Sequence, residues 1–195
     1  MIFDFFEKRV PPYPGHEPRV PPAGFFAFVW ACTRGSRGWI ALLTLTSALM
    51  SVYEALLFAI MGRVVDKLGG VAPADFWAQE RGMVIGITAI LLGSGLLLAL
   101  HTAVMHQVLA INFPMRLRWN FHRLMLGQSM SFYQDEFAGR VSAKVMQTAL
   151  AVRDTCLILT DILVFVVIIF VTIAAVVGSF DRWLLLPFLG WLVLY

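Results

Sequence analysis

The sequence predicts an all-α protein that crosses a membrane several times, and three observations support this fold class. Apolar residues make up 59% of the 195 residues and charged residues 14%, against roughly 45–50% and 25% in soluble globular chains. The mean hydropathy is +0.79. Three apolar segments each exceed the roughly 20 residues that a helix needs to cross a bilayer. This composition excludes a disordered chain and a soluble domain of this size.

Each predicted span is a largely apolar segment of 22 to 25 residues. The second contains no Asp, Glu, Lys or Arg, and the first and third contain one acid each. A further apolar segment at the end has only 13 residues, so we expect an incomplete fourth span there. The spans are predicted at 39–61, 83–104 and 156–180, and the incomplete one at 183–195.

The helices on either side of residues 105–155 are expected to extend well beyond the membrane. After the second span, residues of one helix face recur every three or four positions: Val108, Ile111, Met115, Trp119, His122 and Leu126. A helix over 83–128 would be about 69 Å long, roughly twice the hydrocarbon thickness. We predict two long antiparallel helices joined near 129–139, the first of them kinked at Pro114.

Basic residues indicate the orientation. Eleven of the fifteen Lys and Arg residues lie in 1–38 and 105–155, and cytoplasmic segments carry such an excess. We therefore place the N-terminus and the 105–155 projection in the cytoplasm of a multi-pass protein, in a bacterial inner membrane. The net charge of +3 is not gathered into a basic patch interleaved with aromatic residues, so no nucleic-acid partner is expected.

Two short segments precede the first span. Residues 1–22 form a proline-rich cytoplasmic tail without a cleavable signal peptide, and six of the nine prolines lie in 11–22. We expect an extended tether or disordered tail there, in preference to a docking motif. Residues 23–38 begin with ten apolar residues and contain Arg34 and Arg37. They are too short to span and predict an elbow helix that lies in the membrane interface.

The connector between the two long helices carries an ordered set of residues. These are Arg123, then Phe132-Tyr133, Gln134-Asp135-Glu136, Gly139-Arg140 and Arg153-Asp154. Together with the layout of spans, this order resembles the first intracellular loop of ATP-binding cassette (ABC) exporters. The resemblance covers about residues 24–195. It implies that residues 39–195 are the N-terminal part of a type 1 membrane domain, which has six helices when complete.

The resemblance implies a short coupling helix at the tip of this loop, which docks on a nucleotide-binding domain. The alternative for the two aromatic residues is packing against the chain's own helices. Further partners implied are the lipid bilayer, a second membrane domain in a homo- or heterodimer, and a hydrophobic drug or lipid-like cargo for efflux. The coupling residues would be Phe132, Tyr133, Gln134, Asp135, Glu136, Phe137, Gly139 and Arg140.

The Walker A pattern is absent, because no Lys in the sequence is followed by Ser or Thr. We therefore expect this chain neither to hydrolyse ATP nor to bind a cofactor. ATP and Mg²⁺ would bind in the nucleotide-binding domain of a complete family member. Two hypotheses remain: part of an exporter membrane domain, or a small non-transporting assembly or regulatory subunit.

Glu54 and Asp161 are the two acids inside predicted spans. Intramembrane carboxylates are costly and usually face a cavity or a partner. The two lie at different depths along their helices, so no direct ion pair between them is expected. Each could line a substrate path or be hydrogen-bonded to a neighbouring helix, and for Asp161 we favour the second. His101 and His106 lie about 140° apart around a helix, so we predict satisfied polar residues and no metal site.

Overall fold

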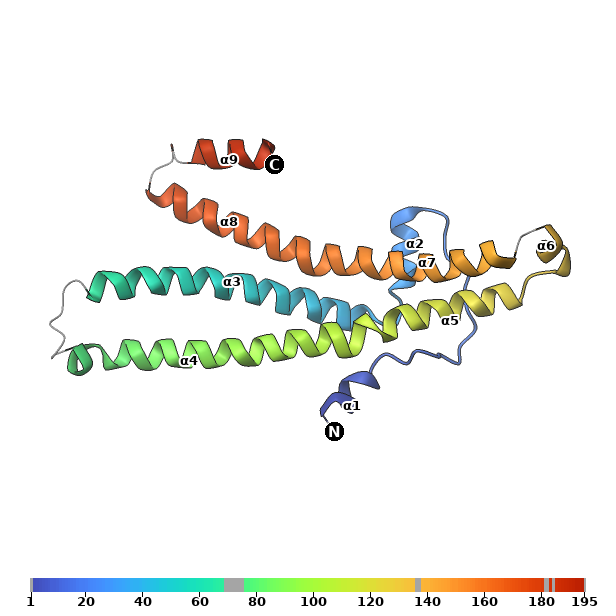
Figure 1. Ribbon diagram of the computed structural model, residues 1–195, viewed down its shortest axis with the longest axis horizontal. Coiled ribbons are helices and arrows are strands. Elements are labelled where there is room, and N and C mark those ends of the chain that lie inside the picture. Colours follow the sequence, from blue (N-terminus) through green and yellow to red (C-terminus); the bar gives the residue numbers. More distant parts are fainter. Residues whose placement is uncertain (1, 69–75, 136–137, 181–182, 184, 195) are drawn as a thin grey trace. The chain divides into compact units, whose positions relative to one another are not determined.

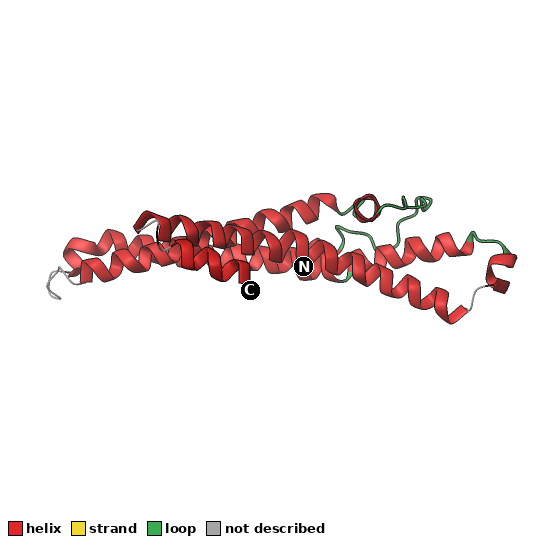
Figure 2. Cartoon of the chain, turned by 90° about the horizontal axis from the view of Figure 1, so that it is seen from above, coloured by secondary structure: helices red, strands yellow, loops and turns green. Residues whose placement is uncertain are grey.

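A computed structural model describes residues 2–68, 76–135, 138–180, 183 and 185–194. These residues form helices and loops and no strand (Figure 2), which confirms the all-α prediction. Two of the elements, η1 and η2, are π-helical. In chain order the elements in Figure 1 are α1 (Ile2–Glu7), α2 (Phe25–Cys32), α3 (Arg37–Leu68), α4 (Phe76–Thr102), η1 (Ala103–Ala110), α5 (Asn112–Leu126), α6 (Met130–Asp135), α7 (Ala138–Leu157), η2 (Ile158–Ile162), α8 (Leu163–Phe180) and α9 (Leu185–Leu194).

Three helical stretches of the described chain are long and apolar enough to cross a membrane. They are Arg37–Val65, Glu80–Leu126 and Gly139–Gly178, with 29, 47 and 40 residues. The three predicted spans lie within or almost within these stretches, and the second and third stretches have about twice the length that a span requires. The predicted incomplete span near the end corresponds to α9, Leu185–Leu194.

The chain divides into two compact units, which are described separately. Unit 1 comprises Met1–Leu45 and Leu100–Asp161, and unit 2 comprises Thr46–Ala99 and Ile162–Tyr195.

The core of unit 1 forms where α5 packs against α7 and α1 packs against η1. Its fully buried apolar side chains include Val104, Val108, Leu109, Phe113 and Leu117 from η1 and α5. Ala149 and Val152 of α7, Leu43 of α3 and Val10 of the tail complete the contacts. This core contains both cysteines, Cys32 and Cys156, which are buried free thiols.

One predicted face of this helix is only partly right. Val108 is buried, but Ile111 is 67% exposed. The prediction assumed regular α-helical turns, whereas η1 is π-helical and has wider turns, which rotate the residues that follow it. The irregularity lies before Pro114, whose nitrogen cannot donate to the carbonyl of Ala110.

We expected the proline-rich tail to be a loose tether, but in the structure it packs on α5. The ring of Tyr13 meets that of Trp119 edge-on, with centroids 5.4 Å apart. Trp119 Nε1 donates to the Pro14 carbonyl at 3.3 Å, and Arg123 Nη1 donates to the His16 carbonyl at 2.7 Å. Extended, proline-rich backbone has no internal hydrogen bonds, so its carbonyls are available to side-chain donors from α5.

The predicted elbow helix is present as α2, Phe25–Cys32. Phe25, Phe26 and Trp30 are exposed, as expected of a helix with an apolar face for the membrane interface. Arg37 lies with its guanidinium 4.0 Å from the Trp30 ring centroid and donates to the Trp30 carbonyl at 2.8 Å. The location of α2 in the membrane interface remains a prediction.

In unit 2, side chains of α3 form hydrogen bonds to the backbone of α4 and of α8. Tyr53 Oη donates to the Ile90 carbonyl of α4 at 2.6 Å, and Ser51 Oγ donates to the Phe165 carbonyl of α8 at 3.3 Å. Lys67, two residues past the first apolar stretch, and Glu80, the first residue of the second, form an ion pair. Such cross-helix hydrogen bonds are typical of packed membrane helices.

Candidate functional site

The predicted coupling segment contains a short helix, α6, between α5 and α7. α6 begins at Met130 and ends at Asp135, so a helix lies where the resemblance implied one (Figure 1). Met130, Ser131 and Gln134 of this helix are exposed. Gly139 and Arg140 follow in the exposed first turn of α7. Glu136 and Phe137 lie outside the described residues.

The two aromatic residues of α6 turn toward their own chain. Their rings meet edge-on, with centroids 5.3 Å apart, and both side chains are half-buried. Tyr133 Oη donates to the Met125 carbonyl in the last turn of α5. Phe132 lines a cavity of about 380 Å³ between α5 and α7. These contacts fix α6 on the end of the helix pair, and the docking of the two aromatic residues on a nucleotide-binding domain stays a prediction.

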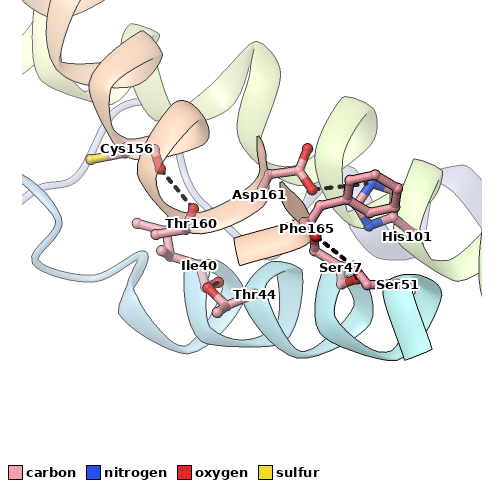
Figure 3. A network of polar contacts seen from close by, with 9 residues as sticks. All are labelled: Ile40, Thr44, Ser47, Ser51, His101, Cys156, Thr160, Asp161 and Phe165. Carbon is pink, nitrogen blue, oxygen red and sulfur yellow. Dashed lines mark hydrogen bonds and ion pairs between the residues drawn. The ribbon is translucent and has the colours of Figure 1, made fainter. Parts of the chain in front are cut away.

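Asp161 pairs with a residue that sequence reasoning did not connect to it. Its Oδ1 lies 3.7 Å from Nε2 of His101, and the two side chains are only 14% and 13% exposed (Figure 3). Both residues belong to unit 1. At this separation the imidazole and the carboxylate lie within ion-pair range but beyond hydrogen-bond distance. The hydrogen bond to a neighbouring helix that we favoured for Asp161 stays a prediction.

Both partners lie at π-helical segments. Asp161 is part of η2, and His101 precedes η1 by two residues. Beside Asp161, Thr160 Oγ1 donates back to the Cys156 carbonyl at 2.7 Å (Figure 3). A widened turn frees backbone carbonyls, and a hydroxyl can satisfy them inside a membrane. Single π-helical turns occur often at functional sites, so the paired polar residues form a candidate site.

Glu54 lies on α3 in unit 2, where it is half-buried. It is therefore a second candidate polar residue of the span region, described separately from the His101–Asp161 pair. In the part of the chain that the structure describes, no group of three or more His, Cys, Asp or Glu side chains is placed to hold a metal ion.

Comparison with known proteins connects the whole chain to one family. The chain is 52% identical over 194 residues to a Haemophilus influenzae protein described as an uncharacterized ABC transporter ATP-binding protein. The match covers all of this chain and 32% of the relative, so the chain spans about a third of that protein's length. No family model matches, and no solved structure matches. This identity over the whole chain confirms the resemblance to ABC transporters that the connector and the layout of the spans predicted.

Proposed function

We propose that the chain is the first part of the membrane domain of an ABC exporter. In this proposal it lines the substrate pathway and connects that pathway to ATP hydrolysis in a nucleotide-binding domain. The observation that carries the proposal is the pair of 47- and 40-residue helical stretches joined through α6. Helices of this length extend beyond the hydrocarbon and can carry a movement from a soluble domain into the membrane.

Nucleotide chemistry would belong to sequence outside this chain. The relative's name states ATP binding, whereas this sequence has no Walker A pattern. ATP and Mg²⁺ would bind in a nucleotide-binding domain that docks on α6 and on the first turn of α7. Further partners in this proposal are the bilayer and a second membrane domain, in a homo- or heterodimer of the inner membrane.

Coupling would run through unit 1. α5 and α7 pack closely through Phe113, Leu117, Ala149 and Val152, so a displacement of α6 moves both helices together. The same unit contains the His101–Asp161 pair. Packed cores respond by discrete rearrangement rather than by continuous deformation. A movement that begins at α6 would therefore change the contact between His101 and Asp161.

The proposed cargo is a hydrophobic drug or lipid-like molecule. Asp161 and Glu54 are the acids available to a pathway inside the spans, and a carboxylate there would favour a cargo with a cationic group. The alternative, a non-transporting assembly or regulatory subunit, is less well supported, because the similarity to an ABC transporter extends over the entire chain.

The coupling role can be tested in the complete transporter with the double variant Phe132→Ala, Tyr133→Ala. We expect transport and cargo-stimulated ATPase activity to fall about tenfold, while basal ATPase activity persists, because the aromatic side chains place α6 against α5 and α7. Transport into inside-out vesicles and ATP hydrolysis are the measurements.

Met130→Ala is the matched control, since Met130 lies on the same helix with its side chain exposed. Tyr133→Phe removes only the hydrogen bond to Met125 and should have an intermediate effect. Unchanged transport and unchanged stimulation in the double variant would show that α6 does not couple the two activities.

A further inference from the structure

A cavity of about 700 Å³ in unit 1 is lined by several basic side chains. It lies between the proline-rich tail, the end of α2 and one side of α5. Its charged and titratable lining residues are Arg19, Arg34, Arg116, His16 and Glu17. Three guanidinium groups therefore face one carboxylate, and the cavity has an excess of positive charge.

Arg116 is the decisive residue, because it is buried without a counter-charge. It is only 7% exposed and makes no hydrogen bond or ion pair with the residues that the structure describes. By contrast, Arg123 donates to the His16 carbonyl and Arg153 pairs with Asp154. Burying an unpaired cation is strongly unfavourable, so an anion that enters the cavity would compensate this charge.

The backbone beside Arg116 is shaped around its guanidinium. Gly35 has a φ of +84°, a conformation that residues with a side chain rarely adopt. A Cβ added at Gly35 would overlap Nη2 of Arg116. The loop between α2 and α3 can therefore approach the guanidinium this closely only with glycine at that position, which holds Arg116 at the cavity.

The remaining lining suggests a ligand with a charged and an apolar part. Val20, Pro21 and Phe121 contribute apolar surface to the same cavity. The cavity also adjoins α2, whose exposed Phe25 and Trp30 suit the interface of a membrane. Arginine binds phosphate oxygens through paired hydrogen bonds. A phospholipid would place its phosphate at the basic side chains and its apolar part against the apolar lining.

We propose that the cavity between the tail, α2 and α5 binds an anionic phosphate group, with Arg116 as the buried ligand and Arg34 and Arg19 at its entrance. The phosphate could belong to a phospholipid headgroup or be free in solution. This inference is independent of the proposed export activity, because it concerns binding alone.

The test uses the purified complete transporter in detergent. Thermal denaturation is followed while dioleoylphosphatidylglycerol, dioleoylphosphatidylcholine or inorganic phosphate is added. A ligand that binds the folded state raises the denaturation temperature according to its affinity. We expect phosphatidylglycerol to stabilise most, and Arg116→Gln to weaken its binding about tenfold because a charge-assisted hydrogen bond is lost.

Arg34→Gln, at an exposed position, should weaken binding about threefold without disturbing the core, and it carries the test if Arg116→Gln does not fold. Arg118→Gln is the matched control, since Arg118 lies on the same helix and lines a different cavity. Stabilisation by inorganic phosphate that depends on Arg116 would support a phosphate site and assign it to a soluble ligand. Equal binding of every probe to the wild type, Arg34→Gln and Arg118→Gln would overturn the proposal.

Discussion

The two units of the chain bury different kinds of side chain. Among the described residues, every buried apolar side chain belongs to unit 1, from Val10 in the tail to Cys156 in α7. In unit 2 the buried residues are Thr46, Ser47 and Ser51, which are small and carry a hydroxyl. Many large apolar side chains of unit 2, such as Leu96 and Phe58, are exposed, and others are half-buried.

This difference indicates two sources of stability in one chain. Unit 1 removes apolar surface from solvent by packing against itself, as a soluble domain does. In unit 2, small hydroxyl residues let helices approach closely and form hydrogen bonds across the contact, as in membrane helix packing. Its exposed apolar surface suits lipid or further helices. In the proposed function, unit 1 would transmit force and unit 2 would provide membrane-facing surface.

The largest effect is expected from Phe113→Ala in unit 1. Phe113 is 1% exposed, so the truncation removes a buried ring and leaves a cavity, and should reduce the free energy of unfolding by about 3–5 kcal/mol. Denaturation of the complete transporter in detergent is the measurement. Leu96→Ala in unit 2, at a position 76% exposed, should cost about 0.5 kcal/mol or less. Equal losses at both positions would erase the distinction between the units.

A smaller effect is expected from Ser51→Ala in unit 2. The substitution removes the hydrogen bonding that Ser51 Oγ shares between the Ser47 carbonyl of its own helix, at 3.0 Å, and the Phe165 carbonyl of α8, at 3.3 Å. Bonds between membrane helices contribute about 0.6 kcal/mol on average. Thr88→Ala is the control, because Thr88 donates only within its own helix, to the Val84 carbonyl. The same unfolding measurement should separate the two variants, and a larger loss for Thr88→Ala would argue against hydroxyl-mediated packing in unit 2.

Apolar length and periodicity were sufficient to predict the helices, because a span must satisfy its backbone within one helix. Periodicity failed at Ile111, where the π-helical η1 changes the number of residues per turn. No local sequence pattern that we used predicts a π-helical segment. The tail was misjudged for a related reason: proline content predicts extended backbone, but whether extended backbone packs depends on donors more than 100 residues away, such as Trp119 and Arg123.

The candidate site was predictable in part. α6, Met130–Asp135, overlaps the start of the segment that the motif marked at Phe132 to Arg140, since that prediction used a contiguous run of residues, and its coupling role stays a prediction. The His101–Asp161 pair was missed, although both residues are polar positions in apolar surroundings and a search for such pairs across different helices could have found it. Arg116 lies off the apolar face predicted for its helix. Its burial arises from the tail and the α2–α3 loop covering that side, which the helix sequence alone does not encode.

The thiol of Cys32 is a direct probe of how closed unit 1 is, and it needs no change to the core. Burial raises its pKa from 9.0 to about 11, and the charge of Cys156 adds to this shift. The thiolate is the reactive form, so alkylation by iodoacetamide at pH 8 should be about 100-fold slower than for an ordinary thiol, as follows from two pKa units. Peptide mass spectrometry would measure labelling of Cys32 beside an exposed reference, Gln134→Cys.

The pH dependence distinguishes a closed core from a merely slow reaction. Labelling at position 134 should level off above pH 9, whereas labelling of Cys32 should keep rising toward pH 11, where its neutral thiol ionises. Because the folded-state pKa is the higher one, the stability that the neutral thiol provides is complete below pH 9 and is lost between pH 9 and 11. Equal labelling of both positions at pH 8 would mean that the core of unit 1 opens as readily as its surface, and the contrast with unit 2 would then not describe the protein in solution.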